Sequence, residues 1–416
     1  MNNLKPVSNI LGQLACGLLL VLLMACADSP RDSIAFGLDT SPVTLDPRFT
    51  TDAVSYRISR LIYRSLVDFD EQFQVIPDLA DWQQLALDHY RFSLNDAGRL
   101  FHDGSNLTAE DVKATYASVL DPAKVSPHRG SVSMIDTMQV IDGDTIDFHL
   151  SRDDPLFPGR LVIGILPKHL IETEHNFSKT PVGSGPLRFI EWPDESRLKL
   201  LRLSDEQDIE FITVKDPTVR VLKLLRGEID LLQSNLPPEM VSWLEKQDPV
   251  VVERQQGDTF TYLGFNLEDP LTADIRVRKA IAHAIDREAI IHYVMADAAR
   301  LAGALLPPNH WAGHGSLQGH DYDPALAKQL LEQAGYGHGR PLSLVYKTSN
   351  NPFRLRLATI IQDQLKAVGI DVEIRSYDWG TFYADIKAGR FQLYSLSWVG
   401  LKMPDVFRYV LHSSAI

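Results

Sequence analysis

The sequence predicts a mixed α/β protein built from two lobes. The chain has 416 residues, 44% of them hydrophobic, which is enough to form the cores of two or three domains. Helices and strands alternate after Phe265, and such alternation predicts a second α/β lobe beyond the mixed pattern that precedes it. A strand at 259–266 would join the lobes. Because a cleft between hinged lobes suits a small ligand, we expect a binding site there.

The first 26 residues predict an export signal that ends at a lipid attachment site. Lys5 precedes a nonpolar run from Leu14 to Ala27, which is too short to span a bilayer but typical of a secretory signal. The run contains Leu23-Met24-Ala25-Cys26, which resembles a lipobox. We therefore predict a lipoprotein signal peptide over residues 1–26 and lipidation of Cys26, which would anchor the mature chain to a membrane.

The cysteine count favours lipidation over an ordinary signal peptide. The chain contains only Cys16 and Cys26, so cleavage before Cys26 would leave a single cysteine and no possible disulfide. The alternative is an ordinary signal peptide that is cut near Ala25 or Ala27. Both alternatives predict a periplasmic or extracytoplasmic location.

Hydrophobic periodicity predicts the elements of the first lobe in order. A short tether at 28–32 leads to a strand at 34–38, and apolar residues from Ile58 to Leu66 form a helical stripe. Thr108 and Asp111 resemble a capping box at the start of a helix. The remaining patterns predict strands at 90–94, 146–150 and 229–232 and a helix at 219–226.

The second half of the chain gives a clearer alternation of elements. Its apolar patterns predict helices at 275–285, 324–334 and 353–368 and strands at 342–346 and 372–376. A last strand begins at Phe391 and ends near Trp398. These elements would form the second lobe.

Four stretches of the chain carry distinctive motifs: Phe101 to Lys113, the glycine-rich turn at Pro181 to Leu187, Tyr262 to Asn266 with Asp274 to Ile281 and Asp286-Arg287, and Ala367 to Val372 leading to Trp398. These stretches resemble the family 5 extracytoplasmic solute-binding proteins, the peptide- and nickel-binding receptors of bacterial ABC importers. The resemblance covers roughly residues 33–410.

The resemblance implies a two-lobed fold of the periplasmic-binding-protein type, type II, with an extra inserted subdomain. It places the first lobe at 33–258, the subdomain at about 48–175 and the second lobe at 259–416. In the family the chain crosses back to the first lobe near its C-terminus; this chain stops at Ile416, so we expect the return segment to be missing and the second lobe to be incomplete.

The resemblance also implies a function. We expect the protein to capture a peptide or a similar small solute between its lobes and to deliver it to an ABC permease in the membrane. No cofactor is implied. A receptor for a nickel or other metal-chelate complex is the alternative within the same class.

Trp398 and Gly400 are the first candidates for ligand binding, because ligands of α/β lobes sit beyond the carboxyl ends of strands. Trp398 could stack on a ligand, or it could be a core residue. Peptide-binding members of the family carry an aspartate directly after this glycine, which pairs with the α-amino group of the peptide. Here the position is Leu401, and Asp405 follows shortly after it.

Four further residues are candidates on the strength of the resemblance. Arg354 and Arg356 stand near the start of a predicted helix, where family members place an arginine for a ligand carboxylate. The sequence does not decide between them, and either could lie on a solvated helix face. Thr51 and Asp52 match a segment that lines the cleft in relatives, although Asp52 could equally cap the helix that follows.

Composition and motifs argue against other classes of function. The net charge of −13 disfavours nucleic acid as a partner. His310, His314 and His320 lie in a loop without a clustered carboxylate, so we predict no metal site there. Gly183-Ser184-Gly185 matches neither a phosphate-binding loop nor a nucleophile elbow. A secreted hydrolase is the alternative from the enzyme class, but no catalytic residues stand out, and we predict that the protein is not an enzyme.

Overall fold

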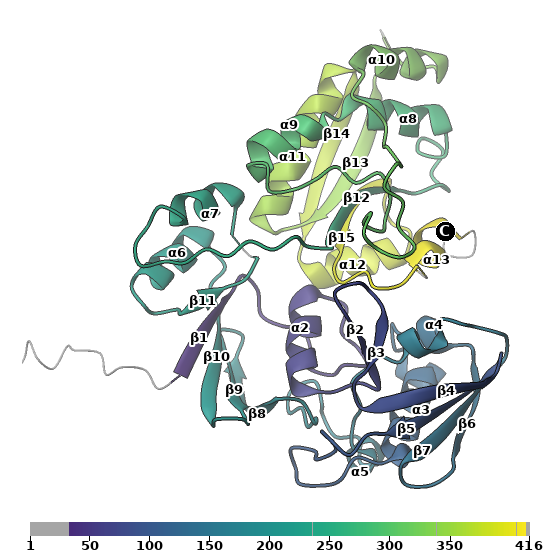
Figure 1. The fold of residues 1–416 in the computed structure, drawn as a ribbon. Helices are drawn as coiled ribbons and strands as arrows, with labels where there is room; N and C mark the ends of the chain where they lie inside the picture. The colour runs from purple at the N-terminus through teal and green to yellow at the C-terminus, as the bar shows by residue number, and fades with distance from the viewer. Residues whose placement is uncertain (1–32, 235, 338, 405, 413–416) are drawn as a thin grey trace, which may run out of the picture.

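The computed structural model describes residues 33–234, 236–337, 339–404 and 406–412 (Figure 1). The predicted signal peptide with Cys26, the tether at 28–32 and Asp405 lie outside the described residues. Within the described part of the chain, no helix is long and apolar enough to cross a membrane. The described elements form three main sheets with helices packed against them.

The first sheet, which we call the N-lobe sheet, has five strands in the order β11-β1-β10-β9-β8. β1 is parallel to β10 and β11, whereas β8, β9 and β10 form an antiparallel meander. Ile58 and Ile62 of α2 pack on this sheet against Leu198, Leu200 and Phe211. The elements are β1 (Ser33–Leu38), α2 (Ala53–Ile62), β8 (Leu187–Asp194), β9 (Arg197–Arg202), β10 (Gln207–Thr213), α6 (Pro217–Leu225), β11 (Leu231–Leu232) and α7 (Pro238–Leu244).

The second sheet, the subdomain sheet, is antiparallel with the order β4-β5-β7-β6. Its inner face carries Tyr90, Phe92 and Phe148, which pack on Tyr116 of α3 in a large apolar cluster. The elements are β4 (Ala80–Ala86), β5 (His89–Leu94), α3 (Ala109–Leu120), α4 (Arg129–Val132), β6 (Ile135–Val140), β7 (Thr145–Leu150) and α5 (Lys168–Glu172), with 3-10 turns at Pro122–Lys124 and Phe157–Arg160. Its outer face is polar, as expected for a half-exposed antiparallel sheet.

The third sheet, the C-lobe sheet, has the order β12-β15-β13-β14. β13 is parallel to β14 and β15, and β12 is antiparallel to β15. Leu344, Tyr346 and Leu393 are buried on it with Ile281 and Leu365 of the covering helices. The elements are β12 (Phe260–Phe265), α8 (Ile275–Ala284), α9 (Arg287–Met295), α10 (Pro324–Gln333), β13 (Leu342–Ser349), α11 (Pro352–Ala367), β14 (Ile370–Tyr377), α12 (Trp379–Lys387), β15 (Leu393–Trp398) and α13 (Val406–Leu411).

Most predicted elements are confirmed, and the errors have local causes. The capping box is present, because Asp111 accepts hydrogen bonds from the N–H and the hydroxyl of Thr108. The helical stripe was predicted to reach Leu66, which is wrong: α2 ends at Ile62, and Leu66 is buried in the subdomain cluster just before β2. α9 and α12 were not predicted, although Asp286 and Asp378 cap them.

Two of the four stretches that carry the family resemblance meet in the fold. Gly183 and Gly185 lie against the last turn of α2, so that a Cβ at Gly183 would come within 2.2 Å of the carbonyl oxygen of Ile62. His102, in the first stretch, contacts this turn twice. Its backbone N–H donates to the carbonyl oxygen of Gly183, and its ring Nε2 lies 3.0 Å from the carbonyl oxygen of Gly185. These motifs therefore hold the fold together rather than carry chemistry.

The subdomain touches the C-lobe through the hairpin β2 (Val67–Phe69) and β3 (Val75–Pro77). Phe73, at the tip of this hairpin, is buried; its ring centroid lies 4.9 Å from the ring of His310, and the ammonium of Lys402 lies 4.8 Å from it. A Cβ at Gly159 would come within 2.6 Å of Met403 Sδ. The two parts of the molecule are thus in direct contact beside the end of β15.

Candidate functional site

Two neighbouring strands of the C-lobe sheet bring the candidate ligand residues together. The register of β12 on β15 sets Phe260 opposite Trp398 and Thr261 opposite Ser397. The hydroxyl oxygens of Thr261 and Ser397 lie 2.7 Å apart. This pair of hydroxyls faces Arg354.

Arg354 reaches the two strands from the first turn of α11. Asn351 caps the helix, since its side-chain oxygen accepts hydrogen bonds from the backbone N–H groups of Phe353 and Arg354. The Arg354 guanidinium donates to Ser397 Oγ at 2.6 Å and to Thr261 Oγ1 at 3.3 Å. The side chain therefore joins the helix to the ends of both strands.

Within the described part of the chain, the charge of Arg354 has no fixed counter-ion. The residue is half-buried, and none of the described carboxylates lies within ion-pair distance of its guanidinium. Burial lowers the pKa of Arg354, and the neighbouring Tyr346 acts in the opposite direction. The first turn of a helix is also an unfavourable place for a cation, because the helix dipole favours negative charge there. A partly desolvated cation without a counter-ion is unfavourable, so this site favours an anionic group.

Arg356 lies two residues further along α11 and faces elsewhere. It is exposed and forms an ion pair with Glu239 of α7. The sequence left open which arginine faces the ligand cleft. The structure gives only Arg354 a place at the strand ends, while Arg356 links α11 to α7.

Trp398 lies at the end of β15 in a small apolar cluster. Its side chain is partly buried and packs with Leu306, Leu401 and Phe260. The indole also interacts with the hydroxyl of Tyr262, on the neighbouring strand β12. Trp398 therefore contributes to a local core, as one of the two interpretations predicted. Because the residue is only partly buried, stacking on a ligand stays a prediction.

Gly400 and Leu401 follow β15 and face different parts of the molecule. Gly400 has a positive φ of 69°, and a Cβ built there would lie 3.8 Å from Tyr56 Cε1 of α2, so this turn faces the N-lobe. Leu401 is only 6% exposed and packs into the cluster with Leu306 and Val406. The residue that replaces the family aspartate is thus part of the apolar interior.

Thr51 and Asp52 stand at the start of α2. Thr51 is exposed. Oδ1 of Asp52 accepts a hydrogen bond of 2.8 Å from the backbone N–H of Ser55, so Asp52 caps the helix, as one of the two sequence interpretations held. Its second oxygen, Oδ2, is buried and has no hydrogen-bond partner among the described residues.

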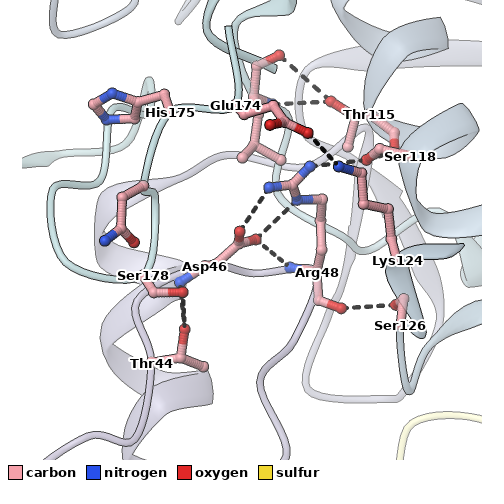
Figure 2. Close-up of polar contacts among 12 residues, drawn as sticks. Thr44, Asp46, Arg48, Thr115, Ser118, Lys124, Ser126, Glu174, His175 and Ser178 are labelled. Atoms are coloured by element: carbon pink, nitrogen blue, oxygen red, sulfur yellow. Dashed lines mark hydrogen bonds and ion pairs between the residues drawn. The ribbon is translucent and has the colours of Figure 1, made fainter. Parts of the chain in front are cut away.

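A buried network fixes the loop that leads to Thr51 and Asp52 (Figure 2). The carboxylate of Asp46 accepts hydrogen bonds from Nε and Nη2 of Arg48 at 3.0 and 2.7 Å, and Nη1 of Arg48 donates to Ser118 of α3. Ser126 donates to the carbonyl oxygen of Arg48. The loop is therefore fastened to the subdomain, which holds the start of α2 in place.

The histidines of the loop at 310–320 do not converge. His310 is buried, with Nδ1 accepting from the N–H of Ala312 and Nε2 donating to the carbonyl oxygen of Lys402. His314 contacts Ser316, whereas the ring of His320 lies 4.9 Å from that of His283. Burial, followed by the charge of His283, lowers the pKa of His320. Within the described part of the chain these residues form no group of three metal ligands.

The family model for bacterial extracellular solute-binding proteins, family 5, matches residues 74–415. The chain belongs to this family. The match spans the subdomain sheet, both strands at the candidate site and the helix that carries Arg354.

Relatives of this family member share its fold over most of their length. The dipeptide-binding protein of Escherichia coli is 26% identical over 445 residues, covering 97% of this chain and 83% of the relative. The solved structure of DppA from Helicobacter pylori, an ABC transporter-associated periplasmic binding protein in complex with the peptide STSA, matches with a TM-score of 0.81 and 26% identity, over 91% of this chain and 80% of that one. NikZ from Campylobacter jejuni, solved in complex with Ni(L-His), is 24% identical with a TM-score of 0.80, over 92% and 80% of the two chains, and shows the fold alone.

These matches confirm the predicted fold class, the two-lobed architecture of family 5. The sequence places Ser397 beside Trp398 at the end of the last predicted strand, but it did not predict that the hydroxyls of Thr261 and Ser397 meet. A cross-strand pair that is 136 residues apart in the chain leaves no local signal. Only the predicted strand at 259–266 hinted that residues there would border the site.

Proposed function

We propose that this solute-binding protein captures a peptide between its two lobes and delivers it to an ABC permease. The observation that carries the proposal is the half-buried guanidinium of Arg354, whose partners among the described residues are the hydroxyls of Thr261 and Ser397. A peptide ends in a carboxylate, and a guanidinium binds a carboxylate with strong, charge-assisted hydrogen bonds. The peptide-binding proteins among its relatives support this choice of ligand.

The remainder of the site suits the other parts of a peptide. Trp398 and Gly400 would border its backbone from the C-lobe, and Thr51 would do so from the loop before α2. The unpartnered oxygen of Asp52 offers an acceptor for a ligand N–H group. The lobe boundaries at 33–258 and 259–416, with the subdomain at about 48–175, belong to the same proposal.

We further propose that the protein binds its ligand without changing it. Its relatives are solute-binding proteins rather than enzymes. A peptide recovered from the protein after long incubation should have its original mass, and steady cleavage would instead favour the hydrolase alternative.

A metal chelate is the second candidate ligand, because NikZ was solved with Ni(L-His). The carboxylate of such a chelator would meet the same arginine. Mass spectrometry of the ligand carried through native purification separates the two, since it would detect either a peptide or a metal complex.

The proposal is tested by calorimetry on matched peptides with a free and an amidated C-terminus. Amidation removes the charge that Arg354 would bind, so we expect it to weaken binding by at least about tenfold, or roughly 1.4 kcal/mol. Equal affinities for both forms would show that Arg354 does not hold a terminal carboxylate.

We propose that Cys26 carries a lipid that anchors the protein to a membrane. It ends the apolar run of the predicted signal and would be the single cysteine of the mature chain. Cys26→Ser should release the protein into the soluble fraction while leaving ligand binding intact. Unchanged membrane retention of the variant on cell fractionation would exclude lipidation at this residue.

A further inference from the structure

A cluster of two histidines and an aspartate lies on the outer face of the subdomain sheet, away from the site at the end of β15. His89 of β5 is the direct cross-strand partner of His149 of β7, and Asp147 stands two residues along β7 on the same face. The imidazole rings are stacked with centroids 4.1 Å apart. One nitrogen from each histidine and one oxygen of Asp147 all lie within 4.8 Å of one another.

The contacts within this cluster leave it incompletely satisfied. Nε2 of His89 is buried and lies 3.1 Å from Oδ2 of Asp147, and this carboxylate is its one close partner among the described residues. Two stacked imidazoles would repel each other if both were protonated. A cation that binds both rings in their neutral form, together with the carboxylate, would satisfy all three side chains at once.

We propose that His89, Asp147 and His149 form a binding site for a divalent transition-metal ion. Two imidazole nitrogens and one carboxylate oxygen are a ligand set that suits Zn²⁺, Ni²⁺ or Cu²⁺ and not the harder Mg²⁺ or Ca²⁺. Water would fill the remaining coordination positions.

The side chains need only a small adjustment to reach an ion. Metal–nitrogen and metal–oxygen bonds of about 2.0–2.2 Å place neighbouring tetrahedral ligands about 3.4 Å apart, so the ligand atoms, which lie within 4.8 Å of one another, must approach by up to about 1.4 Å. The side chain of His89 is 22% exposed, and His149 is also partly exposed, so both rings have room to turn. Asp147 is 4% exposed at its side chain and would remain where it is.

Arg91 is the competitor for the same carboxylate. Its Nε and Nη2 each donate to one oxygen of Asp147 at 2.8 Å, and this pairing is the main reason that the pKa of Asp147 is lowered. The metal ion would displace at least one of these bonds. The charge of Asp142 already acts on Arg91, which gives the displaced guanidinium an alternative partner.

The test is titration of the purified, chelator-treated protein with ZnCl2, NiCl2 and CuCl2, with MgCl2 as the negative control. We expect one ion per chain, and His149→Asn should weaken its binding by at least about tenfold. His169→Asn is the matched control, because His169 pairs with Asp103 in a similar ion pair, and we expect it to leave binding unchanged.

Arg91→Met provides the sharper readout. Removal of the competing guanidinium should tighten metal binding by about threefold or more, whereas a purely structural network would gain nothing from it. Copper electron paramagnetic resonance of the wild-type protein gives a second measurement that needs no variant, since two coordinated imidazoles split the signal by their nitrogen nuclei.

Three outcomes would overturn the proposal. They are a wild-type protein that binds none of the three ions at tens of micromolar, binding that survives His149→Asn unchanged, and a copper spectrum without imidazole coupling. If Arg91→Met does not tighten metal binding, the ion does not displace Arg91 from Asp147. None of these outcomes bears on the site around Arg354, which lies on another sheet.

Discussion

Two arginines of the molecule are both partly shielded from water but are neutralised differently. Arg48 is held by both oxygens of Asp46, and the side chains of this pair are only 10% and 4% exposed (Figure 2). Arg354 is half-buried, and its partners among the described residues are the neutral hydroxyls of Thr261 and Ser397. A fixed carboxylate makes the first arginine structural, and the lack of one among the described residues leaves the second arginine available for an anion from outside.

The largest effect on stability is expected from removing the charge of Asp46. Asp46→Asn should lower the free energy of unfolding by about 3–5 kcal/mol, because the charge of Arg48 would remain buried without its counter-ion. Urea denaturation followed by circular dichroism measures the change. Asp144→Asn is the control, since Asp144 pairs with Arg99 at the surface and should contribute less than about 1 kcal/mol. Similar losses in the two variants would contradict the structural role of the buried pair.

Arg354 should show the opposite pattern, with a large effect on binding and a small one on stability. Arg354→Gln should weaken binding of a peptide with a free C-terminus by about a hundredfold, or roughly 2.7 kcal/mol, and should abolish the difference between free and amidated peptides. The free energy of unfolding should change by less than about 1 kcal/mol, because no protein carboxylate is left unpaired. Calorimetry and urea denaturation on one preparation test both statements. A variant that still distinguishes the two peptides would place the carboxylate elsewhere.

The amino end of the ligand should matter less than the carboxyl end. Leu401 fills the position of the family aspartate and is buried among apolar side chains, so no carboxylate stands there to hold an α-ammonium group. We expect acetylation of a bound peptide to change its affinity by less than about tenfold, or 1.4 kcal/mol. Trp398→Ala should weaken binding more than Leu401→Ala, because the Trp398 ring stands at the strand end.

Calorimetry on matched free and acetylated peptides measures this difference. A loss of about a hundredfold on acetylation would point to another carboxylate, such as Asp52 with its unpartnered oxygen, or Asp405.

The smallest effect on binding and stability is expected at Arg356, which lies on the same helix as Arg354 and can be compared with it directly. Its ion pair with Glu239 is exposed, and such pairs contribute about 0–1 kcal/mol. Arg356→Gln should therefore change stability by less than about 1 kcal/mol and leave peptide affinity within about threefold. A loss of binding as large as that of Arg354→Gln would show that the contact between α11 and α7 controls the ligand site.

Local sequence signals predicted most of the elements but little of the site. The α3 capping box, the strand at 90–94 and the helix at 353–368 follow from patterns within one turn or one strand. Arg354 was a candidate only because of the family resemblance, and Trp398 was a candidate because it lies at the end of a predicted strand. Their geometry depends on contacts across 43 to 136 residues, among them the hydroxyl pair at Thr261 and Ser397, which periodicity cannot reveal.

The cluster of His89, Asp147 and His149 shows the same limit. The sequence predicted the strands at 90–94 and 146–150, and Tyr90, Phe92 and Phe148 prove to be buried on the inner face of the sheet that they form. It could not predict that β5 pairs with β7 in a register that sets His89 against His149. The histidines that drew attention in the sequence, at 310–320, are instead engaged in separate contacts.

The sequence by itself determined the mixed α/β character, the order of most elements, the apolar face of each strand and the family. Periodicity and capping act over a few residues, so they can be read directly from the chain. The tertiary structure alone decided that Arg354 rather than Arg356 reaches the strand ends, that Leu401 is buried and that, among the described residues, Arg48 has a carboxylate partner while Arg354 has none. These facts depend on burial and on which distant side chains share one small volume, and the free energy of a charge changes by several kcal/mol with that environment.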